Sequence, residues 1–367
     1  MKIGIIDADL LRKKKHRFPN LACMKISSYY KSMIGRGGVQ LLNSYDSISG
    51  YDKVFISKVF TDTEVPDGIL SLDNVEYGGT GFFYDKAVPL IPQIEHGMPD
   101  YHLYDDFVNQ MILNGAKPKE FVWYRDYSIG FLTRGCFRHC EFCVNKNYNA
   151  SKMHSPLLEF IDVTRKKLCF LDDNFLACSN WRQILEEVQS TNKPFIFKQG
   201  LDERLLTREK CEILFNSKYD GEYVFAFDNI ADYDLIESKL KIIRSISDKP
   251  IKFYVLVGFD RSNKWDLSFW QQDLYDMFKR IELLMKYKCI PYIMRFNKYE
   301  ESPYRGTYVT VARWCNQPSF FKKVTLKEFI EVDAKYSHKS DCASVRYYQD
   351  VKSALPELVE KYYNMKW

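Results

Sequence analysis

The sequence has no apolar stretch approaching the roughly 20 residues that a membrane-spanning helix requires, so we expect no membrane span. Its first nine residues lack the basic segment and apolar segment of a secretory signal, which predicts a cytoplasmic protein. Charge of one sign is also scarce, because 53 basic residues against 48 acidic ones give a net charge of +5. Over 367 residues, this excess is too small to indicate nucleic-acid binding by itself.

Paired metal-binding motifs are missing as well. The chain has ten cysteines, but a disulfide scaffold is not expected in a cytoplasmic protein of this length. Only Cys136, Cys140 and Cys143 are clustered, and no second C-x2-C or H-x3-H pair accompanies them, as a zinc site usually requires. A zinc site completed by His139 or by Cys178 is the alternative interpretation of this cluster. The other cysteines are scattered singly, and several lie in strand-like or amphipathic segments typical of buried thiols.

Strand and helix patterns alternate along most of the chain. In the first hundred-odd residues, strand-like segments, helices and glycine turns predict a small open α/β sheet. From about residue 121 the alternation becomes regular, and apolar residues between the strands recur at helical spacing. The six expected strands of this part are residues 129–133, 167–171, 194–197, 223–227, 251–257 and 290–296.

These patterns predict an α/β fold with three domains. Residues 1–118 form the small α/β domain, residues 119–300 form a partial (β/α)6 TIM-like barrel, and residues 301–367 form a helical C-terminal cap. Six successive strand–helix units predict a parallel sheet, which right-handed crossovers curl toward a barrel. Active residues of such folds lie at the carboxyl ends of the strands. Polar residues and glycines occupy these ends here: Asp172, Asp173, Asn174, Gln199, Arg204, Asp228 and Gly258.

The cysteine loop follows the first strand of this series. Three thiolates within eight residues can converge on one side of an inorganic cluster, and three ligands for four irons leave one iron open. An open metal position is typical of a catalytic site. Phe137 and Phe142 suit the shielding of such a cluster, because apolar cover limits water access.

The C-x3-C-x2-C loop, with Phe142 before the last cysteine, resembles that of the radical S-adenosylmethionine (SAM) superfamily. The resemblance covers roughly residues 121–300, about half the chain. It implies a 4Fe–4S cluster on Cys136, Cys140 and Cys143, with SAM chelating the open iron. It also implies reductive cleavage of SAM to a 5′-deoxyadenosyl radical, which abstracts hydrogen from a substrate. The electron donor of such an enzyme would be a protein such as flavodoxin or ferredoxin.

The same resemblance implies roles for the strand-end residues. Asp172, Asp173 and Asn174 would receive the SAM amino group, although the superfamily commonly has glycine-glycine-glutamate there. The alternative is that Asp173 or Asn174 caps the next helix. Asp228 would contact the ribose hydroxyls or else form a plain turn, and Gly258 would pass the adenine.

Gln199 and Arg204 also lie at or just past a strand end. They would face the substrate or the SAM carboxylate, and Arg204 is the stronger candidate because a guanidinium suits a carboxylate. Both could equally be residues at the rim of the site or helix caps. No catalytic residue that acts on the substrate can be assigned from the sequence.

The first domain resembles the Rossmann-like cobalamin-binding module that precedes the barrel in one branch of the superfamily. The order of the domains, the Gly78-Gly-Thr-Gly81 turn and the Pro99-Asp100-Tyr101 stretch carry this likeness. The family's Asp-x-His-x-x-Gly loop, whose histidine ligates cobalt, is absent from the sequence. The sequence therefore leaves open whether this domain binds cobalamin. A cobalamin-dependent radical SAM methyltransferase is the alternative function.

A non-catalytic module that binds a metal or nucleic acid is an alternative of another class. Its support is the aromatic and basic segment from Tyr304 to Lys323, since such interleaving suits stacking on single-stranded bases. The same segment can instead be the packed lid of a substrate pocket. The substrate itself is left open among a small molecule, a peptide and a nucleic acid.

Overall fold

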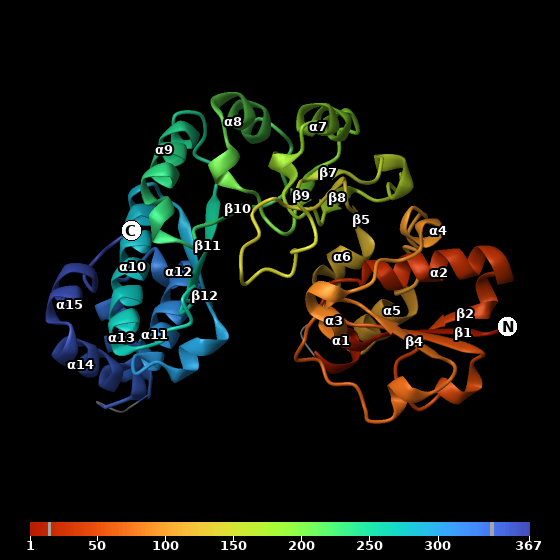
Figure 1. Ribbon diagram of the computed structural model, residues 1–367, viewed down its shortest axis with the longest axis horizontal. Coiled ribbons are helices and arrows are strands. Elements are labelled where there is room, and N and C mark those ends of the chain that lie inside the picture. The colour runs from red at the N-terminus through yellow and green to blue at the C-terminus, as the bar shows by residue number, and fades with distance from the viewer. Residues whose placement is uncertain (14–15, 338–340) are drawn as a thin grey trace. The chain divides into compact units, whose positions relative to one another are not determined.

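The computed structural model describes residues 1–13, 16–337 and 341–367, and it divides into two compact units, Met1–Gln199 and Gly200–Trp367 (Figure 1). The division falls after Gln199, so the first unit holds the expected first domain together with the first three strands of the expected core. No described helix combines the length and the apolar character needed to cross a membrane.

The first unit begins with a four-stranded sheet of order β2-β1-β3-β4 in which all neighbours are parallel. Its strands are β1 (Ile3–Asp7), β2 (Val39–Leu41), β3 (Lys53–Ser57) and β4 (Val75–Gly78). Every residue of β1 is buried, as expected for a central strand covered on both faces. The small open sheet predicted for this part of the chain is therefore present.

Two separate apolar clusters cover the two faces of this sheet. On one face, Ile3 and Ile5 of β1 pack with Cys23, Met24 and Ile26 of α2 (Leu21–Ile34). On the other face, Ile6, Val54 and Ile56 pack with Ala8, Leu42 and Ile48. Asn20 caps α2 by accepting the N–H of Cys23 at 3.2 Å, and the helix ends at Gly35, whose φ is +84°.

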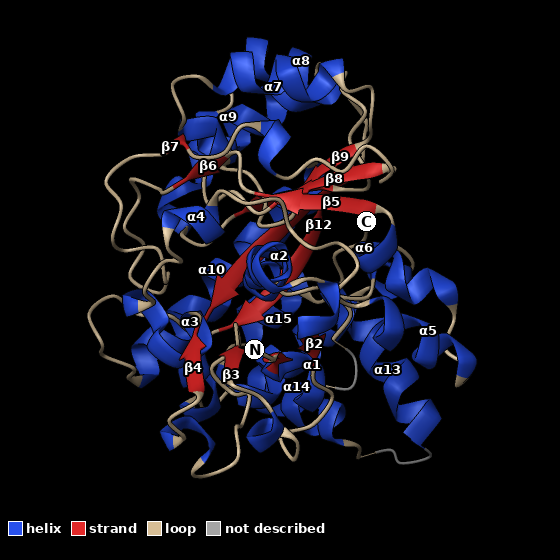
Figure 2. Ribbon diagram, turned by 90° about the vertical axis from the view of Figure 1, so that its right-hand side faces the viewer, coloured by secondary structure: helices blue, strands red, loops and turns tan. Residues whose placement is uncertain are grey.

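Short helices connect this sheet to the rest of the first unit. They are α1 (Ala8–Arg12), α3 (Thr80–Phe83), α4 (Pro92–Glu95), α5 (Asp105–Leu113) and α6 (Val122–Arg125). A second parallel sheet follows, of order β5-β8-β9, and its strands lie side by side in Figure 2. Its strands are β5 (Tyr127–Gly130), β8 (Lys167–Phe170) and β9 (Phe195–Phe197), and α7 (Trp181–Ser190) connects the last two.

The second unit contains a parallel sheet of order β10-β11-β12. Its strands are β10 (Tyr223–Ala226), β11 (Ile251–Val257) and β12 (Ile290–Arg295). Every second residue of β11 is buried, so one face of the strand packs against the core of the unit. The connecting helices are α8 (Arg208–Phe215), α9 (Tyr233–Arg244) and α10 (Leu267–Lys286).

The remaining helices pack on one another, mainly around α11 and α14, at the blue end of the chain in Figure 1. They are α11 (Arg305–Cys315), α12 (Pro318–Phe321), α13 (Leu326–Ser337), α14 (Ala343–Ala354) and α15 (Pro356–Tyr362). Thr325 and Glu328 form the expected capping box of α13, with reciprocal bonds of 2.8 and 3.1 Å. The described residues after residue 300 are mainly helical, as the sequence predicts.

All six strands expected between residues 119 and 300 are present, and each pairs in parallel within its own sheet. The first, β5, begins two residues earlier than expected and ends at Gly130. The class of the fold, mixed α/β with parallel sheets, is confirmed. Closure of the six strands into a partial barrel, and a Rossmann-like identity for the first sheet, stay predictions.

Candidate functional site

A two-residue antiparallel pairing joins the two ends of the cysteine loop. Strand β6 (Thr133–Arg134) pairs antiparallel with β7 (Lys152–Met153), so the residues between them form one closed loop. Gly135 opens the loop with a φ of +97°, and a Cβ there would lie 2.3 Å from the carbonyl oxygen of Ala150. Only glycine fits this position, because both the backbone angle and the close approach exclude a side chain.

The three clustered cysteines are free thiols, and all three are half-buried. Cys23, Cys169, Cys178, Cys211, Cys289 and Cys315 are buried. The sulfur of Cys136 accepts the backbone N–H of Arg138 at 3.5 Å, and that of Cys143 accepts the backbone N–H of Asn145 at 3.4 Å. Burial raises the pKa of Cys143, and the N–H of Asn145 opposes this effect.

Asp172 follows β8 and supports the strand that leads into the cysteine loop. Its side chain is 1% exposed and accepts the N–H groups of Leu132 and Thr133 at 3.1 and 2.7 Å and the Thr133 hydroxyl at 2.6 Å. Burial raises the pKa of Asp172 to about 7 against the opposing effect of these hydrogen bonds. The structure thus gives Asp172 a supporting role, and its contact with SAM stays a prediction.

Asp173 holds the loop itself at two points. Oδ2 accepts the N–H of Gly135 at 2.7 Å, and Oδ1 accepts Nδ2 of Asn145 at 2.6 Å. The next residue, Asn174, is buried and donates from Nδ2 to the sulfur of Cys136 at 3.4 Å. The acidic stretch after β8 therefore contacts the cysteine loop on both sides of the cysteines, as expected for residues at neighbouring strand ends.

Residues outside the second sheet also hold the loop. Oε1 of Glu95, at the end of α4, accepts Nζ of Lys25 at 3.0 Å, pairs with Nε2 of His154 at 3.0 Å, and lies 3.7 Å from Nη2 of Arg134. Burial raises the pKa of Glu95, but His154 and Lys25 outweigh it and lower the value to about 2. At the far side of the loop, the hydroxyl of Tyr84 donates to the carbonyl of Phe142 at 3.2 Å.

In the second unit, Asp228 and Gly258 lie at the ends of neighbouring strands. Oδ1 of Asp228 accepts the N–H of Leu256 at 3.1 Å, and burial raises the pKa of its carboxyl. Gly258 has a φ of +74°, and a Cβ there would lie 3.2 Å from Cβ of Tyr299. The backbone angle of Gly258 favours glycine at this position, which its place at a strand end alone does not.

A buried arginine, which the sequence did not indicate, supports these two strand ends. Arg280 of α10 is 2% exposed, and its Nη1 donates to the carbonyls of Phe227 and Leu256 at 2.9 and 2.8 Å. Nη2 of Arg280 lies 3.9 Å from Oδ1 of Asp273, which also accepts through Oδ2 from Gly258 N–H and from the Tyr308 hydroxyl. The sequence did not indicate this role, because an arginine within a helix is usually exposed. Its position among the buried residues of α10 is the one feature that could have suggested it.

Arg204 and Gln199 are placed differently from each other. Arg204 is engaged within the second unit, since Nε donates to Asp202 at 2.7 Å and Nη1 to Asp232 at 3.1 Å. Gln199 is exposed at the end of the first unit. Glu203, which the sequence did not single out, is 1% exposed. Its Oε2 accepts the N–H of Ala226 at 3.2 Å, and its Oε1 has no hydrogen-bond partner among the described residues. Burial and the repulsion of Asp202 raise the pKa of Glu203 to about 8.

The cysteine loop offers three thiols, the donor type that holds an iron–sulfur cluster. Across the residues that the structure describes, no three His, Cys, Asp or Glu side chains stand together as a metal-holding group, and this holds for the three cysteines with or without His139 or Cys178. The three half-buried thiols lie in one loop that begins at Gly135, and N–H groups point at two of the sulfurs. Ligation by Cys136, Cys140 and Cys143 stays a prediction.

The aromatic segment near the C-terminus is packed rather than available for stacking. Tyr308, Trp314 and Phe321 are completely buried, and Tyr304 is 7% exposed. These rings cannot stack on nucleic-acid bases without unfolding the helices that carry them, so the main support for a nucleic-acid-binding module is lost. The packed alternative is the one that the structure favours.

Comparison with known proteins defines the fold. No protein-family profile matches the chain, and no curated protein matches it. Among solved structures, it is similar to the radical SAM methyltransferase TsrM from Kitasatospora setae with cobalamin and a [4Fe–4S] cluster bound, at a TM-score of 0.52 and 11% identity over 80% of this chain and 75% of that chain. The same enzyme with tryptophan substrate and the SAM analogue aza-SAM gives a TM-score of 0.50 and 10% identity over 79% and 72%. The expected resemblance to radical SAM enzymes is confirmed as a likeness of fold.

Proposed function

We propose that this chain is a radical SAM enzyme that binds a 4Fe–4S cluster through Cys136, Cys140 and Cys143. The observation that carries the proposal is the C-x3-C-x2-C loop, which begins at Gly135 and is held by Asp173 near the end of β8. A fold similar to that of a radical SAM methyltransferase supports it independently, because fold likeness at 11% identity does not depend on the motif. The substrate is not assigned.

The chain's residues would hold the reactants in a defined way. A bound cluster would supply the electron for reductive cleavage of SAM to methionine and a 5′-deoxyadenosyl radical. Asp173 and Asn145 hold the loop that carries the cysteines, and Asp173 is the better placed of the two aspartates to accept from the SAM ammonium, since Asp172 is enclosed. Asp228, whose Oδ1 accepts the N–H of Leu256, would contact a ribose hydroxyl, and Gly258 would contact the adenine.

The same proposal extends to partners. The electron would come from a small redox protein such as flavodoxin or ferredoxin, because no other redox group is expected in the chain. Gln199 and Arg204 would contact the substrate or the SAM carboxylate, with Arg204 held for this by Asp202 and Asp232. The enzyme would act in the cytoplasm on a small molecule, a peptide or a nucleic acid.

A cobalamin-dependent methyltransferase is the second candidate function. The observation that favours it is the contact between the helical turn Tyr84–Lys86, which follows α3, and the cysteine loop. The Tyr84 hydroxyl donates to the Phe142 carbonyl, and Nδ2 of Asn147 donates to the Asp85 carbonyl at 2.5 Å. These contacts bring the carboxyl edge of the first sheet toward the cysteines, where a second cofactor could serve the same reaction. Against it, the chain lacks the Asp-x-His-x-x-Gly loop that would supply a cobalt ligand.

One experiment separates these candidates. The protein is reconstituted with iron and sulfide without oxygen, reduced with dithionite and incubated with SAM, with and without hydroxocobalamin. Formation of 5′-deoxyadenosine supports hydrogen abstraction, whereas S-adenosylhomocysteine that appears only with hydroxocobalamin supports methyl transfer. Neither product, from protein that carries zinc in place of iron, would refute both.

A further inference from the structure

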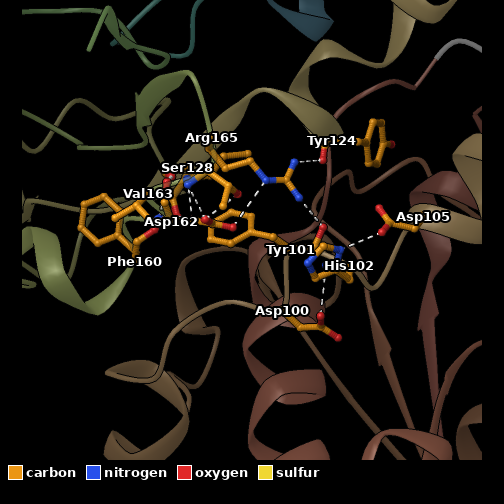
Figure 3. Close-up of polar contacts among 12 residues, drawn as sticks. Asp100, Tyr101, His102, Asp105, Tyr124, Ser128, Phe160, Asp162, Val163 and Arg165 are labelled. Atoms are coloured by element: carbon orange, nitrogen blue, oxygen red, sulfur yellow. Dashed lines mark hydrogen bonds and ion pairs between the residues drawn. The ribbon is translucent and has the colours of Figure 1, made fainter. Parts of the chain in front are cut away.

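The first unit contains a cavity of about 530 Å³ that includes no residue of the cysteine loop. Its walls are α2, Arg36 just after that helix, residues 98–102 and residues 161–163, and Figure 3 shows polar contacts of the last two segments. Small-molecule sites in proteins usually measure roughly 300 to 1,000 Å³. We infer that this cavity is a binding site for a small molecule that carries a phosphate group.

The floor of the cavity is held rigidly before any ligand binds. The hydroxyl of Tyr101 donates to the carbonyl of Phe160 at 2.6 Å and accepts the N–H of Ile129 at 2.8 Å. Arg165, which is 6% exposed, donates from Nη2 to the carbonyl of Tyr101 at 2.7 Å and from Nη1 to that of Tyr124 (Figure 3). These bonds tie residues 98–102 to β5, so a ligand would not have to order this wall.

The two carboxylates of the cavity already have partners. Oδ2 of Asp100 accepts Lys31 Nζ and the Ser27 hydroxyl, each at 2.6 Å, and Oδ1 accepts the N–H of His102 at 3.1 Å. Oδ1 of Asp162 accepts from the N–H and hydroxyl of Thr164 at 2.8 and 2.7 Å. The acceptors that would attract a cationic ligand are therefore used within the chain, and neither acid stands as an isolated negative charge.

The donors of Ser28 and Lys31 on α2, and of Arg36 just beyond that helix, are the groups left for a ligand. Arg36 forms no ion pair or hydrogen bond with any residue that the structure describes, and neither does the hydroxyl of Ser28. Lys31 has an ammonium with three protons, of which the pair with Asp100 occupies one. A guanidinium fork, an ammonium and a hydroxyl on one wall match an anion with several acceptor oxygens, which is the chemistry of a phosphate.

The volume and the apolar lining of the cavity favour an organic phosphate ester over an inorganic anion. Met98, Ile161 and Val163 also line the cavity, and Val163 is 82% exposed. The volume exceeds what an inorganic anion fills, and these side chains offer apolar contact to an organic body. Lys31 also complements the negative end of α2, as basic residues in a last helical turn commonly do, but Arg36 lies beyond that helix and has no such role.

Calorimetric titration of the full-length protein at physiological salt tests the inference, with phenyl phosphate, inorganic phosphate and benzoate as probes. We expect saturable binding of one phenyl phosphate, weaker binding of inorganic phosphate and little binding of benzoate. Arg36→Met should weaken phenyl phosphate at least about tenfold, because a charge-assisted pair is lost. Arg261→Met, which removes an exposed arginine of the second unit, is the matched control and should bind as the wild type does.

Three results would overturn the inference: no saturable binding of phenyl phosphate, benzoate binding as tightly as phenyl phosphate, or unchanged binding in Arg36→Met. Should Arg36→Met not fold, Arg36→Gln and Ser28→Ala serve in its place, with the same expected loss for the arginine and a smaller one for the serine. The site does not depend on the proposed function. Cluster assembly, measured as iron content, should be equal in all of these variants, so a failure of either proposal can be recognised separately.

Discussion

Asp173 accepts the backbone N–H of Gly135 at 2.7 Å, one residue before the first cysteine of the loop. The same carboxylate accepts from Asn145, two residues after the last cysteine, at 2.6 Å. One charged side chain after β8 therefore closes both arms of a loop that is only partly buried. Asp173 therefore holds the cysteine loop, a role in addition to the contact with the SAM amino group that its place at a strand end predicts.

Asp173→Asn should loosen the cysteine loop. An asparagine keeps one acceptor oxygen but presents an amide N–H₂ where the other donor approaches, so one charge-assisted bond is lost, worth about 1.5 to 3 kcal/mol. We expect lower iron content after reconstitution and faster loss of the cluster to a chelator. Asp67→Asn, which neutralises an exposed aspartate of the first unit, controls for the change in charge. Iron content and loss rate equal to those of the control would contradict the loop-holding role.

Replacing any one of Cys136, Cys140 and Cys143 by alanine should abolish the cluster. A 4Fe–4S cluster with an open iron has no spare protein ligand, so iron should fall from about four per chain to near zero. The brown colour and the absorption of the reconstituted protein should disappear in parallel. Cys178→Ala and Cys315→Ala remove buried thiols and should keep their iron. Full iron content in any of the three loop variants would show that the ligand set is wrong.

Glu203 should make the protein less stable as the pH rises. Its pKa is raised from 4.5 to about 8 in the folded state, so the folded protein binds more protons than the unfolded one between these values. The free energy of unfolding therefore falls across this window, by about 1.4 kcal/mol per pH unit for this group. The contribution is fully present below pH 4.5 and is lost as the pH passes 8.

Glu203→Gln tests this pH dependence by urea unfolding. The neutral amide should raise the free energy of unfolding relative to the wild type by a few kcal/mol at pH 8.5 and change it little at pH 5. Glu187→Gln alters an exposed glutamate on α7 and should leave the pH profile as it is. Parallel profiles of the wild type and Glu203→Gln would mean that Glu203 is ionised in the folded protein at neutral pH.

Arg280→Met should destabilise the second unit strongly. The change leaves the carbonyls of Phe227 and Leu256 without their buried donor and leaves Asp273 without its cation, which typically costs about 3 to 5 kcal/mol. Asp273→Asn in the same chain should recover part of the loss, because it removes the unpaired charge. A loss below about 1 kcal/mol, measured by urea unfolding, would contradict a role for Arg280 in holding the strand ends.

Much of the local structure could be predicted from the sequence, because each feature depends on neighbours along the chain. The six strands of the core follow from short apolar runs that end at polar residues, and the capping box at Thr325 and Glu328 from residues three apart. The C-x3-C-x2-C spacing singled out Cys136, Cys140 and Cys143 and predicted the class of fold that the comparison with solved structures supports.

Only the tertiary structure decided what the individual side chains contact. The sequence could not distinguish Asp172 from Asp173, yet Asp172 is enclosed by Leu132 and Thr133 while Asp173 spans the cysteine loop. Arg280 and Glu203 gave no sequence signal, because burial of a charge depends on segments distant in the chain. The aromatic residues near the C-terminus had the composition of a stacking surface but are buried as core. Composition and spacing determine which groups are available, whereas burial and hydrogen-bond partners depend on how distant segments pack.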